Sequence, residues 1–265
     1  MIRLLSIIFL SIFSLFAVGC AVVPKEEGAA FVAAAQATKS GTDPLFDQLS
    51  AAEKHQQSIS IKASRPHQFA VGDAYAFATN EDGSSSRSFR AGVSVIVDYA
   101  ALLQSLQEGS GTAATQAQIQ KIAADISAAA LVPELGAAAL ALKPLIDHLL
   151  NAQSRMEARR LAIDAAPKVE HLIIALRDAA PAIYKTIVTD KIISGSVKGT
   201  DFDEYKVVAA NYVVLLDKLL ASFHALVSAY ERPSNAAVLR AISENTGELT
   251  ADAKALRSAL GKAQN

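Results

Sequence analysis

The chain has 265 residues, with 25 basic and 26 acidic side chains and a formal net charge of −1. This near-neutral balance gives no overall electrostatic footprint for nucleic acid or anionic lipid. Aromatic residues make up 6% and tryptophan is absent, which argues against a carbohydrate platform or a base-stacking surface. No nucleic-acid partner is therefore expected.

The only cysteine is Cys20. Small exported domains that rely on disulfides carry an even set of cysteines, and this chain has no second one to pair. Any folded body after Cys20 must therefore be stabilised by packing alone.

The N-terminus reads as an export signal. Arg3 is its one positive charge, and an apolar core of about 13 residues follows from Leu4 to Phe16, too short to span a bilayer as a helix. The next residues, Ala17-Val18-Gly19-Cys20, resemble the lipobox of bacterial lipoproteins. That resemblance implies cleavage between Gly19 and Cys20, a diacylglycerol thioether on Cys20, and usually an acyl chain on its freed amine.

The lipobox resemblance also implies a location. Ala21, rather than aspartate, follows the cysteine, a pattern that goes with delivery to the outer membrane in Gram-negative lipoproteins. We expect residues 1–19 to be the signal peptide, 20–28 a short lipidated tether, and 29–265 the body. The body is expected to face the periplasm, close to the membrane.

Helical periodicity dominates the first half of the body. Thr42-Asp43-Pro44 resembles a helix start, and apolar residues then recur at spacings of three and four up to Ala63. A shorter helix is expected over 68–79, a loop over 80–86, and a long central helix over 86–108. Another helix is expected over 113–131.

Prolines 133, 144, 167 and 181 interrupt the middle of the chain. The sequence Asp-Ala-Ala-Pro occurs at 164–167 and again at 178–181, two heptads later. Each aspartate is a candidate cap for a new helix, and each proline is alternatively a kink within a longer one. The pattern also leaves open whether these positions serve as hinges or only shape helices around a core.

The C-terminal third predicts two long helices. A helix is expected over 201–230, where apolar residues repeat at spacings of three and four from Tyr205 to Tyr230, typical of a helix that packs lengthwise against others. A last helix over 235–262 is expected to break or bend near Asn245-Thr246-Gly247. Long helices with short links predict an all-α fold, an elongated antiparallel bundle of about six to eight helices.

The sequence contains none of the following catalytic or metal-binding motifs. No Glu-x-x-His pair or His-Glu-x-x-His motif involves His55, His67, His148, His171 or His224. No serine lies in Gly-x-Ser-x-Gly, and the segment 195–200 lacks the spacing of a phosphate loop. We therefore expect no enzyme activity, no cofactor and no metal.

Three hypotheses for the body remain. The first is a scaffold or interaction module that contacts another envelope protein while Cys20 holds it to the membrane. The second is a small-ligand-binding bundle with an interior pocket around Tyr99, Tyr205 and Tyr212. The third is a membrane-active protein in which the apolar stretch from Ile126 to Leu150 is a concealed hairpin, the alternative being ordinary core helices.

Overall fold

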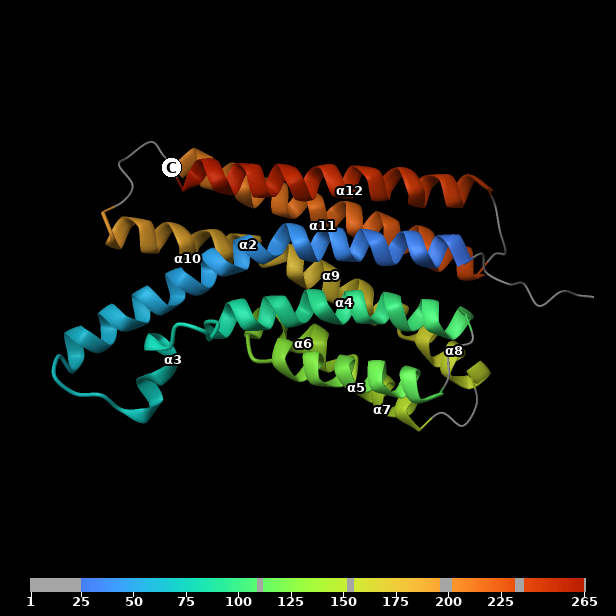
Figure 1. Ribbon diagram of the computed structural model, residues 1–265, viewed down its shortest axis with the longest axis horizontal. Coiled ribbons are helices and arrows are strands. Elements are labelled where there is room, and N and C mark those ends of the chain that lie inside the picture. The colour runs from blue at the N-terminus through green and yellow to red at the C-terminus, as the bar shows by residue number, and fades with distance from the viewer. Residues whose placement is uncertain (1–24, 109–111, 152–154, 196–201, 232–235, 265) are drawn as a thin grey trace, which may run out of the picture.

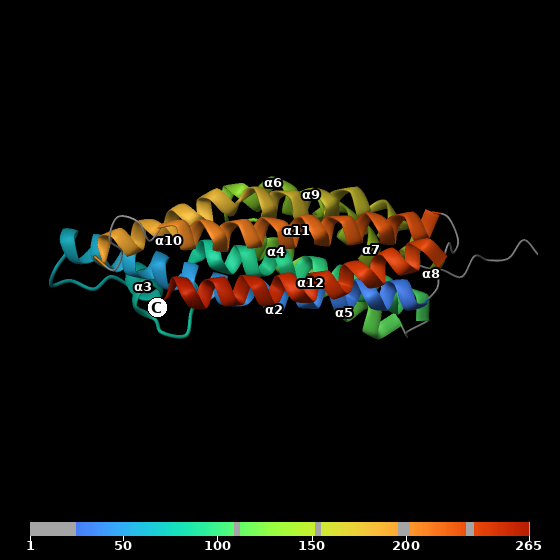
Figure 2. The ribbon, with the colours of Figure 1, turned by 90° about the horizontal axis from the view of Figure 1, so that it is seen from above.

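The computed structural model describes residues 25–108, 112–151, 155–195, 202–231 and 236–264, and its described part is an elongated all-α bundle without strands (Figures 1 and 2). Eight helices have ten or more residues: α2 (Lys25–Ser64), α4 (Ser84–Glu108), α5 (Thr112–Ala129), α8 (Arg155–Asp164), α9 (Ala166–Asp178), α10 (Ala180–Ile193), α11 (Phe202–Glu231) and α12 (Ala236–Ala263). Shorter elements are the 3₁₀ turn η1 (Val71–Asp73), α3 (Ala74–Phe77), α6 (Pro133–Leu140) and α7 (Lys143–Leu150). The predicted fold class is confirmed.

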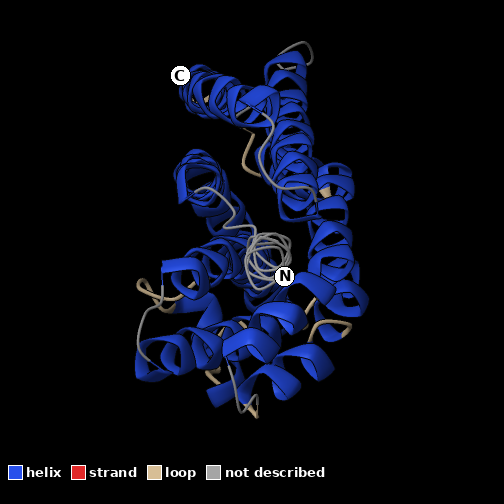
Figure 3. Cartoon of the chain, turned by 90° about the vertical axis from the view of Figure 1, so that its right-hand side faces the viewer, coloured by secondary structure: helices blue, strands red, loops and turns tan. Residues whose placement is uncertain are grey.

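The long helices run lengthwise and share one core. Helix α2 packs against α4 and α12, and α11 packs against α12 and α9. Figure 3 shows these helices nearly end-on. Aromatic side chains meet in the centre: ring centroids are 5.6 Å apart for Phe31 and Phe223, and 6.1 Å apart for Tyr99 and Phe223. Such aromatic contacts bury large apolar areas and stabilise the bundle interior.

Helix α2 does not begin at Thr42, as the capping pattern predicted, but runs unbroken through Pro44. The Thr42 hydroxyl donates to the Lys39 carbonyl instead of capping a new helix, and Asp43 binds Lys39 and Arg90. An interior proline costs about 3 kcal/mol, and buried apolar residues on both sides, Phe31 and Phe46 among them, offset that cost. Residues 25–28, expected as the end of the tether, are helical and belong to α2, whereas residues 20–24 lie outside the described part.

Each of prolines 133, 144, 167 and 181 occupies the first or second position of a separate helix. Proline is tolerated there because those N–H groups have no partner inside the helix. Asp164 and Asp178 end α8 and α9 rather than capping the next helices, so the capping alternative is wrong. The linking residue Ala179 has helical backbone angles, so α9 and α10 follow one another across a bend.

Two other expectations differ from the structure. Helix α12 continues through Asn245-Thr246-Gly247 without a break, and the Thr246 hydroxyl donates to the carbonyls of Ile242 and Ala30. The helix expected over 68–79 is reduced to η1 and α3. The long helices expected over 86–108, 113–131 and 201–230 are confirmed as α4, α5 and α11, with ends shifted by two residues or fewer.

Buried Asp98 of α4 and half-buried Asp125 of α5 lie close to one lysine, Lys121. Asp98 accepts from Lys121 at 2.9 Å, and half-buried Asp125 lies beside Asp98. Burial, followed by the neighbouring Asp98, raises the pKa of Asp125 to about 6. Asp125 therefore binds its proton more tightly in the folded chain than in the unfolded one.

This pair predicts a pH-dependent stability. The free energy of unfolding should fall as pH rises from about 4 to about 6, because the folded chain resists ionising Asp125. Asp125→Asn should remove this slope and stabilise the protein at pH 7 by about 1 kcal/mol, a value reduced for partial solvent exposure. Urea unfolding at pH 4, 5, 6 and 7 measures both effects. An unchanged slope in the variant would contradict the assignment.

Candidate functional site: a groove between α9–α10 and α11

The interior around Tyr99, Tyr205 and Tyr212, where a ligand pocket was one hypothesis, is packed. The Tyr99 hydroxyl donates to the Ala162 carbonyl at 2.7 Å, Tyr212 to Leu176 at 2.8 Å and Tyr205 to Ala263 at 2.7 Å. The space beside Tyr205 and Tyr212 measures only about 10 Å³, at most room for one water. The expected interior ligand pocket is therefore wrong, because these side chains fill the space themselves.

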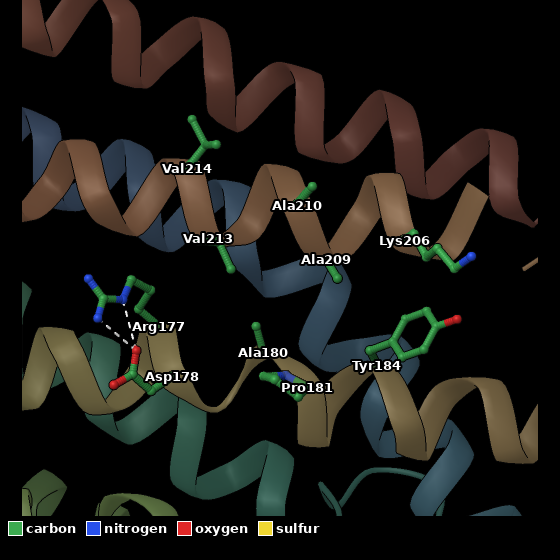
Figure 4. A pocket seen from close by; sticks show the side chains of 10 residues that line it. All are labelled: Arg177, Asp178, Ala180, Pro181, Tyr184, Lys206, Ala209, Ala210, Val213 and Val214. Carbon is green, nitrogen blue, oxygen red and sulfur yellow. Dashed lines mark hydrogen bonds and ion pairs between the residues drawn. The ribbon is translucent and has the colours of Figure 1, made fainter. Parts of the chain in front are cut away.

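A hollow lies on the surface instead, between the start of α10 and the first half of α11. This first hollow has a volume of about 670 Å³ and is open to solvent. Its lining is mainly small and apolar, with charged side chains at its ends: Arg177, Asp178, Ala180, Pro181, Tyr184, Lys206, Ala209, Ala210, Val213 and Val214. In Figure 4, Arg177 and Asp178 lie at one end, and Tyr184 and Lys206 lie at the other.

A second hollow of about 460 Å³ lies along the same helix pair, between the start of α9 and the second half of α11. It is lined by Ile163, Asp164, Ala166, Pro167, Glu170, Phe223, His224, Val227 and Ser228. Both hollows lie between α9–α10 and α11, and we refer to the two together as the groove.

The two hollows repeat with a spacing of 14 residues on both sides. Asp164, Ala166 and Pro167 line the second hollow, and the residues 14 positions later, Asp178, Ala180 and Pro181, line the first. On α11, positions 223, 224, 227 and 228 correspond to 209, 210, 213 and 214. Fourteen helical residues span about 21 Å, so the groove offers two similar hollows about that far apart.

The start of a helix explains each hollow. At Pro167 and at Pro181 the chain bends into a new helix, and short side chains such as Ala166 and Ala180 face α11 there. Alanine and proline leave volume that a leucine at the same place would fill. The Asp-Ala-Ala-Pro repeat thus has a structural consequence, which is a groove.

Two polar contacts join α9 to α11 between the hollows, one heptad apart. Glu170 Oε1 lies 3.0 Å from His224 Nε2, and Arg177 Nη1 lies 3.0 Å from Asp217 Oδ1. Hydrogen bonds to Asp178 and then Asp217 raise the pKa of Arg177. These pairs hold α9 to α11 and set the register of the two hollows, although exposed pairs of this kind add little stability.

Two of the candidate histidines each pair with a single carboxylate. His55 Nδ1 pairs with Asp190 at 2.6 Å, His224 pairs with Glu170, and the described residues contain no group of three possible metal ligands. Gly195 has a left-handed φ of 67° and ends α10, while residues 196–200 of the loop lie outside the described part. Gly19 and Cys20 also lie outside it.

The apolar stretch from Ile126 to Leu150 forms the end of α5, α6 and α7, and Leu135, Ile146 and Leu149 are buried in the core. Two described helices are long and apolar enough to cross a membrane, over Ser84–Leu106 and Phe202–Ala229. Both belong to the packed bundle, with 67% and 44% of their apolar windows buried.

The groove was missed in the sequence, although its signal was present there. The Asp-Ala-Ala-Pro repeat marked one wall, whereas the residues of α11 that line the two hollows mostly differ in type between them. Only the structure shows that these two segments face each other. No family model matches the chain, and no curated protein or solved structure matches it either.

Proposed function

We propose that this chain is a lipid-anchored protein of the bacterial outer membrane whose helical body docks a helix of another envelope protein. The anchor is Cys20, and the body faces the periplasm. The docking face is the groove between α9–α10 and α11. The chain acts as an interaction module without catalysis.

The observation that carries this proposal is the two-heptad spacing of the hollows. A helix laid in a groove presents its apolar side chains every three or four residues, so residues two heptads apart fall on one face. Two hollows about 21 Å apart fit two such side chains of one partner helix. Val214, which is 44% exposed, adds apolar surface at the edge of the first hollow, and burial of that surface by a partner would be favourable.

A small apolar ligand in the first hollow is the second candidate, favoured by the volume of about 670 Å³, which falls within the range of ligand sites. Such a ligand would occupy one hollow, so its binding free energy would not depend on the second hollow 14 residues away. The two candidates therefore differ in whether the second hollow matters.

The test places a charge in each hollow separately. Ala210→Glu alters the first hollow and Ser228→Glu the second, and both positions are exposed, so the fold should persist. We expect each to reduce co-purification of the partner from cross-linked envelopes by about tenfold or more, since an apolar partner side chain would have to displace water from the new carboxylate. Ala255→Glu, exposed on α12, is the matched control and should leave co-purification unchanged.

Loss of the partner with Ala210→Glu but not with Ser228→Glu would favour the single-hollow ligand. Co-purification unaffected by either change would refute the groove as the docking face.

A further inference from the structure

The segment from Arg65 to Phe77 lies at the end of the molecule opposite the start of α2 (Figures 1 and 2). Helix α2 has 40 residues, which corresponds to a length of about 60 Å. The groove lies along the side of the bundle and does not include this segment.

Large apolar side chains project into solvent from this end. Phe69 is 69% exposed, Val71 88%, Tyr75 57% and Phe77 43%. We call these four residues the aromatic tip. Single exposed apolar residues are common on proteins, but four within nine consecutive residues are characteristic of a binding surface.

The backbone of the tip is held in place rather than frayed. Arg65 Nη2 lies 2.7 Å from Oδ1 of buried Asp73, whose Oδ2 accepts from the backbone N–H of Ala70 at 2.9 Å. The guanidinium of Arg87 lies over the Tyr75 ring, 5.4 Å from its centroid. These contacts fix a turn that keeps the apolar side chains facing outward.

An exposed lysine, Lys62, lies in the last turn of α2, just before the tip. No acidic residue occurs between Glu53 and Asp73, and Lys62 and Arg65 lie in that stretch; the carboxylates of Glu81 and Asp82 follow the tip, where Arg87 and Arg90 pair with them. Asp73 is buried and bound to Arg65, so it presents no negative charge to a partner. Lys62 and His67 are exposed.

We propose that the aromatic tip inserts into the interface of an anionic lipid bilayer. Aromatic side chains partition to the headgroup level, where their rings are shielded while polar atoms stay hydrated. Basic side chains beside them are attracted by anionic headgroups. The tip supplies both properties at one end of a rod, and this contact does not depend on what the groove binds.

Because the chain has no tryptophan, a single introduced one reports on its own surroundings. Phe69→Trp places the probe in the tip, and Val207→Trp, at a position 52% exposed on α11, is the matched control. The full chain is purified from membranes and reconstituted in vesicles with brominated acyl chains. One set contains phosphatidylglycerol and phosphatidylcholine, and the other contains phosphatidylcholine alone.

We expect the Phe69→Trp emission to shift to shorter wavelength and to be quenched in the anionic vesicles only, with Val207→Trp unquenched in both. Adding Lys62→Glu to Phe69→Trp should lower the ratio of inserted to free tip, read from the quenched fraction, by about fivefold or more. Circular dichroism serves to check that both variants keep their helices.

Three results would overturn the proposal. The first is an unquenched Phe69→Trp in anionic vesicles. The second is equal quenching in the neutral vesicles. The third is a probe shielded only when envelope protein is added, which would assign the tip to a protein partner.

Discussion

Replacing Gly41 with alanine should destabilise the bundle by about 1–3 kcal/mol, the usual cost of overpacking a tight core contact. A Cβ at Gly41 would lie 2.7 Å from the Cβ and 2.9 Å from the Cα of Ala253. The second contact is with backbone, so relief requires α2 and α12 to move apart. Those two helices pack closely against each other, and Leu215 of α11 lies 3.3 Å from the same point.

Gly247→Ala is the matched control on the other helix of this contact. It lies inside α12 with open space around the added methyl group, so it should stabilise the protein by about 0.5–1 kcal/mol through helix propensity alone. Urea unfolding measures the free energy of unfolding of both variants, which should fall for Gly41→Ala and rise for Gly247→Ala. If Gly41→Ala is as stable as wild type, α2 and α12 do not approach as closely as described.

Cys20→Ser should abolish acylation and release the body from the membrane, an all-or-none effect. The lipid chains on Cys20 are the anchor that the lipobox resemblance implies, and two or more such chains give stable attachment where one gives only marginal binding. Incorporation of an alkyne-tagged fatty acid measures the modification. Fractionation after a high-salt wash, which strips proteins held by charge, measures release.

Ser14→Ala, a substitution within the apolar leader, is the control and should leave both readouts unchanged. Fatty-acid label retained by Cys20→Ser would contradict the lipoprotein assignment. Full retention in the washed membrane fraction would contradict it as well.

Periodicity predicted the long helices well, because a stripe of buried side chains depends on local spacing alone. The stripe from Tyr205 to Tyr230 became α11 with almost the predicted ends. Single-residue signals were less reliable. Pro44 looked like a helix start, yet packing on both sides of it carries α2 through, whereas Pro133 and Pro181 do begin helices. The residue is proline in each case, so packing against the rest of the bundle decides whether a helix starts there.

The site was harder to predict than the fold because it depends on two segments that face each other. Tyr99, Tyr205 and Tyr212 share the apolar pattern of a pocket lining, but each hydroxyl is satisfied by a backbone carbonyl from another helix. Such partners lie 36 to 63 residues away, and no local pattern encodes them. The groove could likewise not be predicted from the Asp-Ala-Ala-Pro repeat alone, because it also depends on the antiparallel pairing of α9–α10 with α11.

Site-specific photo-crosslinking in living cells tests the docking groove most directly. A photoreactive residue is placed at Ala210 in the first hollow, at Ser228 in the second, and at Ala255 on α12 as a control. The account predicts one partner protein cross-linked from both hollows, through two sites on a single helix about 14 residues apart, and no such adduct from Ala255. Adducts that differ between the hollows, or an equal yield from Ala255, would contradict it.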